Sequence, residues 1–163
     1  MTLEVRPITS DQLLGYLQAV GDSSVSVGLV GLTSRCYRCG GQGVAIAGVV
    51  VPAIVVRALL SKDDDLFLYF ESVGEALRDA LDPVWLRQHF IGPLKVRRSR
   101  PRPEGYMSNG CHSCDAIIGS HPLCEAVEKI DLERLPEFVI GHAMLPLDAV
   151  RKAVESGKVQ SEW

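Results

Sequence analysis

Two Cys-x-x-Cys pairs constrain this chain more than any other feature of its sequence. Four of the five cysteines form them, Cys36 with Cys39 and Cys111 with Cys114. Zinc binds four ligands in a tetrahedron, and two intervening residues allow one tight turn to direct both thiolates at the same ion. Each pair therefore offers half of a site. We predict one structural Zn²⁺ ion held by Cys36, Cys39, Cys111 and Cys114.

The residues beside the cysteines suit tight turns, but the distance between the pairs is unusual. Gly40 and Gly41 follow the first pair, and Asn109 and Gly110 precede the second. Such residues accept backbone conformations that other side chains disfavour. The 71 residues from 40 to 110 contrast with the roughly 15 to 20 of compact zinc ribbons. We expect an insertion that the metal closes into a loop.

The sequence around the knuckles resembles known zinc-binding patterns. The first pair, in SRCYRCGG, looks like a zinc-ribbon knuckle. The second, in YMSNGCHSCDAIIGSHPL, resembles a pattern in largely uncharacterised bacterial proteins. Those proteins have an aromatic residue after the first cysteine, an Asn before the second pair, and an Ala and then a Gly after it. The resemblance covers only the knuckles; it supports zinc and implies no activity.

The length and composition indicate one folded unit, which we take as residues 1–163. A chain of this length can bury a core of its own without a metal. With 47% apolar and 23% charged residues, it belongs to none of the disordered or coiled-coil classes. Only 6% of the residues are aromatic, which argues against a large base-stacking platform. We predict an α+β domain: a small antiparallel sheet carrying both knuckles, with helices inserted at about 71–91 and packed after the second knuckle.

The first half of the chain suggests a hairpin that ends at the first knuckle. Thr9 and Gln12 have the form of a capping box, which predicts a helix through Val20. Strands are expected at 25–29, with an irregularity at Val30, and at 44–51, with Cys36 and Cys39 at the tip between them. An exposed turn at 62–65, which includes Asp63, Asp64 and Asp65, leads into a buried strand at 66–70.

The second half suggests helices and short strands. Ser72 and Glu75 form a second capping box, and Asp82-Pro83 restarts the helix through Phe90. The prolines of 92–105 favour an edge strand or an extended loop. We expect a helix opening at Pro122, a short strand at 138–140 and a last helix at 146–156.

The cysteine count and the apolar pattern bear on the compartment. The first ten residues lack the basic stretch and the apolar run that a secretory signal needs. The most apolar stretch, 43–56, is shorter than the ~20 residues of a membrane helix and contains Pro52. We therefore expect a cytoplasmic protein without a membrane span, where a disulfide framework is disfavoured.

A thiol-based redox enzyme using one Cys-x-x-Cys pair is the alternative. Redox pairs are found singly at a helix N-terminus, whereas strand and glycine signals flank both pairs here. His112 is interpreted as a knuckle surface residue. His121 and Cys124 could together bind a metal, but Cys124 falls beside Leu123 on an apolar helix face and is interpreted as a core residue. A closed shell of four cysteines disfavours a catalytic zinc.

One basic segment suggests a binding surface. It places five positive charges within eight residues, while the rest of the chain has 12 basic and 20 acidic side chains. The segment consists of Lys95, Arg97, Arg98, Arg100 and Arg102. These side chains could bind phosphates, protect an edge strand, or offset the negative charge of a tetrathiolate zinc site. We predict a non-enzymatic zinc module that engages a protein or nucleic-acid partner; the oligomeric state stays undetermined.

Overall fold

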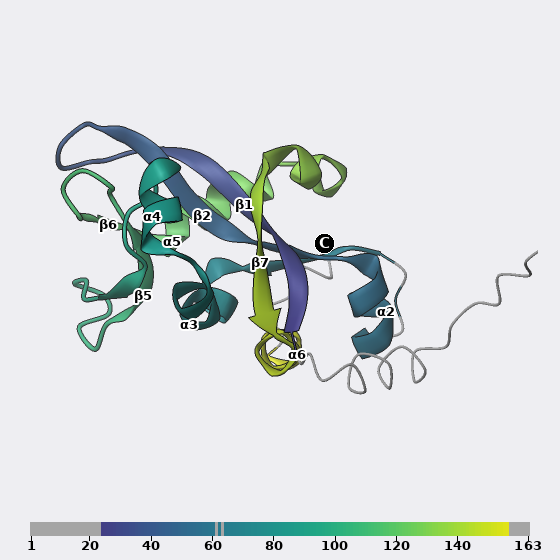
Figure 1. Ribbon diagram of the computed structural model, residues 1–163. Helices are drawn as coiled ribbons and strands as arrows, with labels where there is room; N and C mark the ends of the chain where they lie inside the picture. The colour runs from purple at the N-terminus through teal and green to yellow at the C-terminus, as the bar shows by residue number, and fades with distance from the viewer. Residues whose placement is uncertain (1–23, 61, 63, 157–163) are drawn as a thin grey trace, which may run out of the picture.

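A computed structural model describes residues 24–60, 62 and 64–156 of the chain. It is built around a four-stranded antiparallel sheet of order β3-β2-β1-β7 (Figure 1). The strands are β1 (Ser24–Arg35), β2 (Gln42–Val51), β3 (Leu66–Tyr69) and β7 (Val139–Pro146). The hairpin of β1 and β2 carries the first knuckle at its tip, as expected. The predicted helix at 9–20 and Asp63 lie outside the described residues.

The long central strand β1 is buried on both of its faces. Val25, Val27 and Leu29 pack into the core on one side of the sheet, and Val30 and Leu32 pack on the other side. The side chains of β1 therefore alternate between the two faces of the sheet through Val30 without a break. A strand covered on both faces is continuously apolar, and this is why the pattern seemed to shift at Val30.

The irregularity predicted at Val30 exists, but it belongs to the neighbouring strands. The register of β1 with β2 skips Ala47, and the register of β1 with β7 skips Ile140. Both extra residues lie next to Val30. Two bulges therefore flank the same point of the central strand, where they increase the local twist of the sheet.

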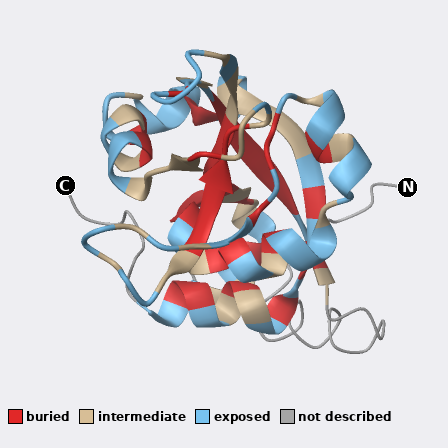
Figure 2. Ribbon diagram, turned by 90° about the vertical axis from the view of Figure 1, so that its left-hand side faces the viewer, coloured by how far each residue is buried: buried red, intermediate tan, exposed pale blue. Residues whose placement is uncertain are grey.

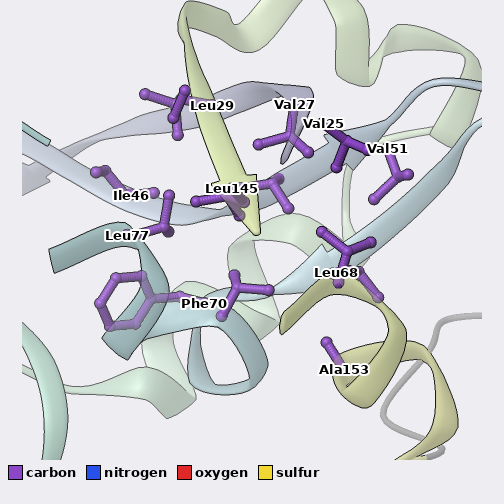
Figure 3. Packing of buried hydrophobic residues seen from close by; sticks show 14 of the residues in the cluster. Val25, Val27, Leu29, Ile46, Val51, Leu68, Phe70, Leu77, Leu145 and Ala153 are labelled. Carbon is purple, nitrogen blue, oxygen red and sulfur yellow. The ribbon is translucent and has the colours of Figure 1, made fainter. Parts of the chain in front are cut away.

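Helices cover both faces of this sheet. The main core lies between one face and the helices α2 (Ala53–Leu60), α3 (Phe70–Ala80) and α6 (Leu147–Glu155) (Figure 3). The helix α5 (Ser120–Glu128) and the 3-10 helix η1 (Leu132–Phe138) contribute Val127 and Leu135 to a smaller core on the opposite face. Buried positions concentrate in the strands between these layers (Figure 2).

Two helix starts differ from the prediction, one because its cap is distant along the chain and one because no side chain caps it. The helix α2 is not among the predicted elements; its first N–H, of Ala53, donates to Asp65 Oδ1 at 2.7 Å. Asp65, predicted as a solvated turn residue, is therefore the N-terminal cap of a helix that starts 12 residues earlier. The predicted capping box at Ser72 is wrong, because α3 already begins at Phe70 and places Ser72 inside its first turn.

Other element boundaries follow the expectations more closely. Asp82 caps α4 (Pro83–Gln88) through a 2.8 Å bond from the Val84 N–H, as predicted, although α4 ends before Phe90. α5 begins at Ser120, two residues before Pro122. β7 continues to Pro146, well beyond the predicted 138–140, and α6 matches the predicted last helix.

A second antiparallel sheet of order β4-β5-β6 carries the second knuckle. It consists of β4 (Lys95–Arg97), β5 (Tyr106–Gly110) and β6 (Ile117–Ile118). β4 is an edge strand, as its prolines and charges suggested. The described chain thus has two sheets where one was predicted, and each sheet presents one knuckle at a hairpin tip.

The buried side chain of Asn109 joins the two sheets. β3 pairs only with residues 48–51 of β2, so Ile46 lies beyond the end of β3. The amide of Asn109 reproduces a strand pairing there: its Oδ1 accepts from the Ile46 N–H at 2.8 Å, and its Nδ2 donates to the Ile46 carbonyl at 2.9 Å. Asn109 is 1% exposed. One side chain therefore satisfies two backbone groups that water cannot reach.

Replacing Asn109 with Ala should destabilise the fold strongly. The substitution leaves the N–H and C=O of Ile46 without partners, and each unsatisfied buried group costs about 1–3 kcal/mol. We expect the free energy of unfolding, measured by urea denaturation, to fall by about 2–5 kcal/mol. Gln88→Ala removes an exposed amide and serves as the matched control. An equal effect of the two substitutions would show that the Asn109 bridge is unimportant.

Candidate metal centre

The sulfur atoms of the four paired cysteines converge at one point, at the end of the molecule where the two hairpin tips meet (Figure 1). Cys36 Sγ lies 3.6 Å from Cys114 Sγ, and Cys39 Sγ lies 3.7 Å from Cys111 Sγ. All four lie within 4.8 Å of one another. Ligands of a tetrahedral zinc with Zn–S bonds of about 2.3 Å are about 3.8 Å apart. This cluster can therefore hold one metal ion.

The first knuckle is a hydrogen-bonded turn that orients its own sulfur atoms. The Cys36 N–H donates to the Gly41 carbonyl, and the Gly40 N–H donates to the Cys36 carbonyl, both at 2.9 Å. Gly40 has a φ of 71°, which only glycine adopts at little cost. Two further N–H groups, of Arg38 and Gly41, donate to Cys36 Sγ and Cys39 Sγ at 3.4 Å each. These bonds favour the thiolate form that a metal requires.

The second knuckle has the same turn with a different residue at its strained position. The Cys111 N–H donates to the Ala116 carbonyl at 2.8 Å, and the Asp115 N–H donates to the Cys111 carbonyl at 2.9 Å. Asp115 occupies the place of Gly40 and has a φ of 60°. The left-handed conformation is unfavourable for a residue with a side chain, although Asp tolerates it better than most. Contacts of the Asp115 side chain must compensate.

Two basic side chains of β4 hold Asp115. Lys95 Nζ and Arg97 Nη2 each form a short ion pair with its carboxylate. The Arg97 side chain is only 8% exposed, and it also donates to the carbonyls of Ser108 at 2.8 Å and Pro93 at 2.9 Å. Burial raises the pKa of Asp115, but the bonds from Lys95 and Arg97 outweigh it and hold that pKa below its usual value. The second knuckle is therefore anchored to the edge of its sheet.

Gly110 gives the Arg97 side chain room to reach Asp115. A Cβ on Gly110 would lie 2.1 Å from Arg97 Nη2, a distance that no packing allows. Sequence analysis assigned Asn109 and Gly110 to a turn before the cysteines. Both instead belong to β5, where one bridges the sheets and the other permits a close approach. The residue types were recognised, but their long-range partners were not.

The thiols could not all ionise together without a cation. The Cys39 N–H, opposed by burial, lowers the pKa of Cys36 to about 6. The Ala116 N–H lowers the pKa of Cys114, but burial and the three neighbouring sulfur atoms outweigh it and raise that pKa to about 11. Like charges at this spacing repel one another strongly. A bound divalent cation removes the conflict, because it stabilises every thiolate that it contacts.

The other predicted candidates lie outside this cluster. The His112 ring packs edge-on against Phe90, with 5.6 Å between ring centres. His121 is exposed and lies 3.9 Å from Glu125. Cys124 is half-buried on α5, whose Leu123 is buried. None of the three belongs to the one group of potential metal ligands found in the described part of the chain.

The structure divides the predicted basic segment into two sets. Lys95 and Arg97 hold Asp115, and Arg102 pairs with Glu71 at 2.6 Å. Arg102 also lies over the ring of Tyr106, 4.3 Å from its centre. The other two arginines, Arg98 and Arg100, are exposed and form no ion pair within residues 24–60, 62 and 64–156. Three of the five positive charges thus stabilise the fold.

Comparison with known proteins identifies no protein to which this chain is similar. No family profile, curated protein or solved structure matches the chain. Within residues 24–60, 62 and 64–156, no helix has both the length and the apolar character needed to cross a membrane. Functional inference therefore depends on the geometry of the site.

Arg97→Met should weaken metal binding without touching a ligand. Loss of the guanidinium releases Asp115, so the second knuckle loses its anchor, and supporting contacts of this kind are worth about 10–100-fold in metal affinity. Competition with a chromophoric chelator measures the affinity. Arg98→Met is the matched control. Asp115→Asn should have a smaller effect, because Asn also tolerates a positive φ. Unchanged affinity in Arg97→Met would disprove the anchoring role.

Proposed function

We propose that this chain is a non-enzymatic zinc-binding module whose metal-ordered surface engages a protein or nucleic-acid partner. In this proposal one Zn²⁺ ion is bound by Cys36, Cys39, Cys111 and Cys114. The observation that carries it is the convergence of four sulfur atoms, from two distant pairs, within 4.8 Å of one another. Four protein thiolates complete the shell of zinc and leave no position for a substrate.

The zinc ion would cross-link the two sheets. The described contacts between them include the Asn109 bridge, a few residue pairs of β2 and β5, and the packing of Met107 of β5 in the main core. Structural zinc contributes about 10–16 kcal/mol in finger peptides, which is comparable with the roughly 5–15 kcal/mol net stability of a whole domain. A metal at this junction can therefore decide whether the two hairpins stay together.

Zinc is favoured by the chemistry of the donor atoms. Soft thiolates select zinc, cuprous ions or iron–sulfur clusters, and a single tetrahedral tetrathiolate site suits zinc or iron. The ligand set of this cluster contains no oxygen or imidazole donor. In a reducing compartment such as the cytoplasm, which we propose for this protein, the thiols stay available for the metal.

The redox alternative is less well supported. In thiol oxidoreductases the helix dipole lowers the pKa of the attacking cysteine. Both pairs lie instead in hairpin turns, between β1 and β2 and between β5 and β6. The lowered pKa of Cys36 has a different source, the N–H groups of its own knuckle. The same groups serve a metal site equally well.

Metal analysis of the purified chain is the direct test. We expect one zinc per chain, and Ser at any of the four paired positions should reduce the zinc content, because a hydroxyl does not ionise to replace a thiolate. Cys124→Ser is the matched control and should keep its zinc, since Cys124 is outside the cluster. A metal-free native protein with one or two rapidly reacting thiols would favour the redox alternative instead.

Removal of the metal should destabilise the whole fold. A loss of about 5 kcal/mol lowers the Tm of a chain of this size by about 10–20 °C. We expect a shift of at least this size after chelation, with reversal on adding Zn²⁺. The chelator itself is controlled by repeating the scan on a variant that has already lost its zinc. An unchanged Tm in the zinc-depleted protein would be incompatible with a structural metal.

A further inference from the structure

Charge is distributed unevenly between the metal-bearing segments and the rest of the chain. The segments that bear the knuckles, 24–51 and 83–115, contain eight of the 17 Lys and Arg residues but two of the 20 Asp and Glu residues. The rest of the chain holds nine basic and 18 acidic residues. Even a tetrathiolate zinc site, with its formal charge of about −2, leaves these segments positive. This part of the molecule therefore attracts polyanions.

The tip of the first knuckle presents an aromatic ring to solvent. Tyr37 is 78% exposed, although a tyrosine normally gains free energy by burying its ring. Arg35 and Arg38 flank it, are exposed, and form no ion pair with the described residues. The hydrogen-bonded turn fixes the backbone beneath this ring. Tyr37 is thus a pre-ordered stacking surface between two free positive charges.

A second exposed ring lies near the other knuckle. Phe90 is 60% exposed and has a φ of 58°, a conformation that costs a bulky residue about 1–3 kcal/mol and that here ends α4. The Phe90 carbonyl accepts from the Val44 N–H at 2.9 Å, and its ring contacts His112. Arg87, one turn earlier, is exposed. Among the aromatic side chains that the structure describes, Tyr37 and Phe90 are the two exposed ones.

We infer that these side chains form a binding face for single-stranded nucleic acid. This knuckle face consists of Arg35, Tyr37, Arg38, Arg87 and Phe90. Unpaired bases would stack on the two rings, and phosphates would contact the arginines; base–aromatic stacking needs no particular sequence. A duplex hides the faces of its bases, so it would use only the charges. The inference rests on the proposed function, because the metal-held turn positions Tyr37.

Fluorescence anisotropy with labelled oligothymidine and oligouridine of about 12 nucleotides tests this face on the full zinc-loaded chain. We expect binding at low salt that weakens as salt is added. Tyr37→Ala should weaken it about 5- to 100-fold, because one stacked base is lost. Tyr37→Phe keeps the ring and should bind like the native chain. Replacing Arg35 and Arg38 with Gln should reduce the steepness of the salt dependence by about 0.7 per arginine.

Phe90→Asn separates binding from folding. Asn tolerates a positive φ better than Phe, so this variant should be at least as stable as the native chain and still bind the oligonucleotide several-fold more weakly. Arg151→Gln, on α6 and outside the knuckle face, is the control and should change neither property. If Phe90→Asn is as stable as the native chain and binds more weakly, unfolding cannot explain the weaker binding.

Three results would overturn the inference that the knuckle face binds single-stranded nucleic acid. They are absence of binding at low salt, native affinity in Tyr37→Ala, and equal affinity for a duplex of the same length. If one of them occurs while the preparation holds one zinc per chain and keeps its Tm, the proposed zinc module stands without this binding face. Zinc content and Tm, measured on the same samples, decide the proposed function separately.

Discussion

The convergence of four cysteine sulfur atoms is the constraint on which the rest of this structure depends; in the proposed function a bound cation relieves the repulsion among their thiolate forms. Sulfur atoms within 4.8 Å of one another come from hairpins that belong to different sheets. Each turn aims its sulfurs with backbone N–H groups, and neither turn alone offers a complete site. Convergence therefore requires that both sheets hold their hairpin tips in place. The first tip is supported by the long strands β1 and β2, and the second, on much shorter strands, depends on the contacts of Arg97 with Asp115.

The edge of β2 that faces away from β1 shows how the candidate metal centre is joined to the core. Three different devices cover this edge in succession: β3 pairs with residues 48–51, the side chain of Asn109 with Ile46, and the backbone of Phe90 with Val44. An uncovered edge would leave unpaired backbone groups and invite aggregation. All three devices come from the segment between the knuckles. A metal bound by both knuckles would therefore also help to hold the groups that complete the sheet.

Local signals predicted the parts of this site that are local. The Cys-x-x-Cys spacing identified the four sulfur atoms, and Asp82-Pro83 identified a helix start that the structure confirms. The errors arose where the partner is distant along the chain: Asp65 caps a helix 12 residues away, and Asn109 bonds Ile46 across 63 residues. A cap or a bridge of this kind leaves no periodicity in the sequence. Two-sided burial of β1 likewise removed the alternation that marks a strand covered on one face.

Departures from local rules are concentrated near the metal centre. Phe90 and Asp115 are the two non-glycine residues with positive φ among those that the structure describes. The two exposed aromatic rings, Tyr37 and Phe90, lie in the same segments, which also carry most of the excess positive charge. For Asp115 the compensation is visible in its ion pairs. For Phe90 the backbone provides it: this residue ends α4, where the Ile91 N–H donates to the Leu86 carbonyl at 2.9 Å, and its own carbonyl accepts from the Val44 N–H. These bonds explain the backbone of Phe90 but not its ring, which is 60% exposed and gains only an edge contact with His112. Proteins break local rules mainly at functional sites, and the exposure of this ring favours a binding role for Phe90.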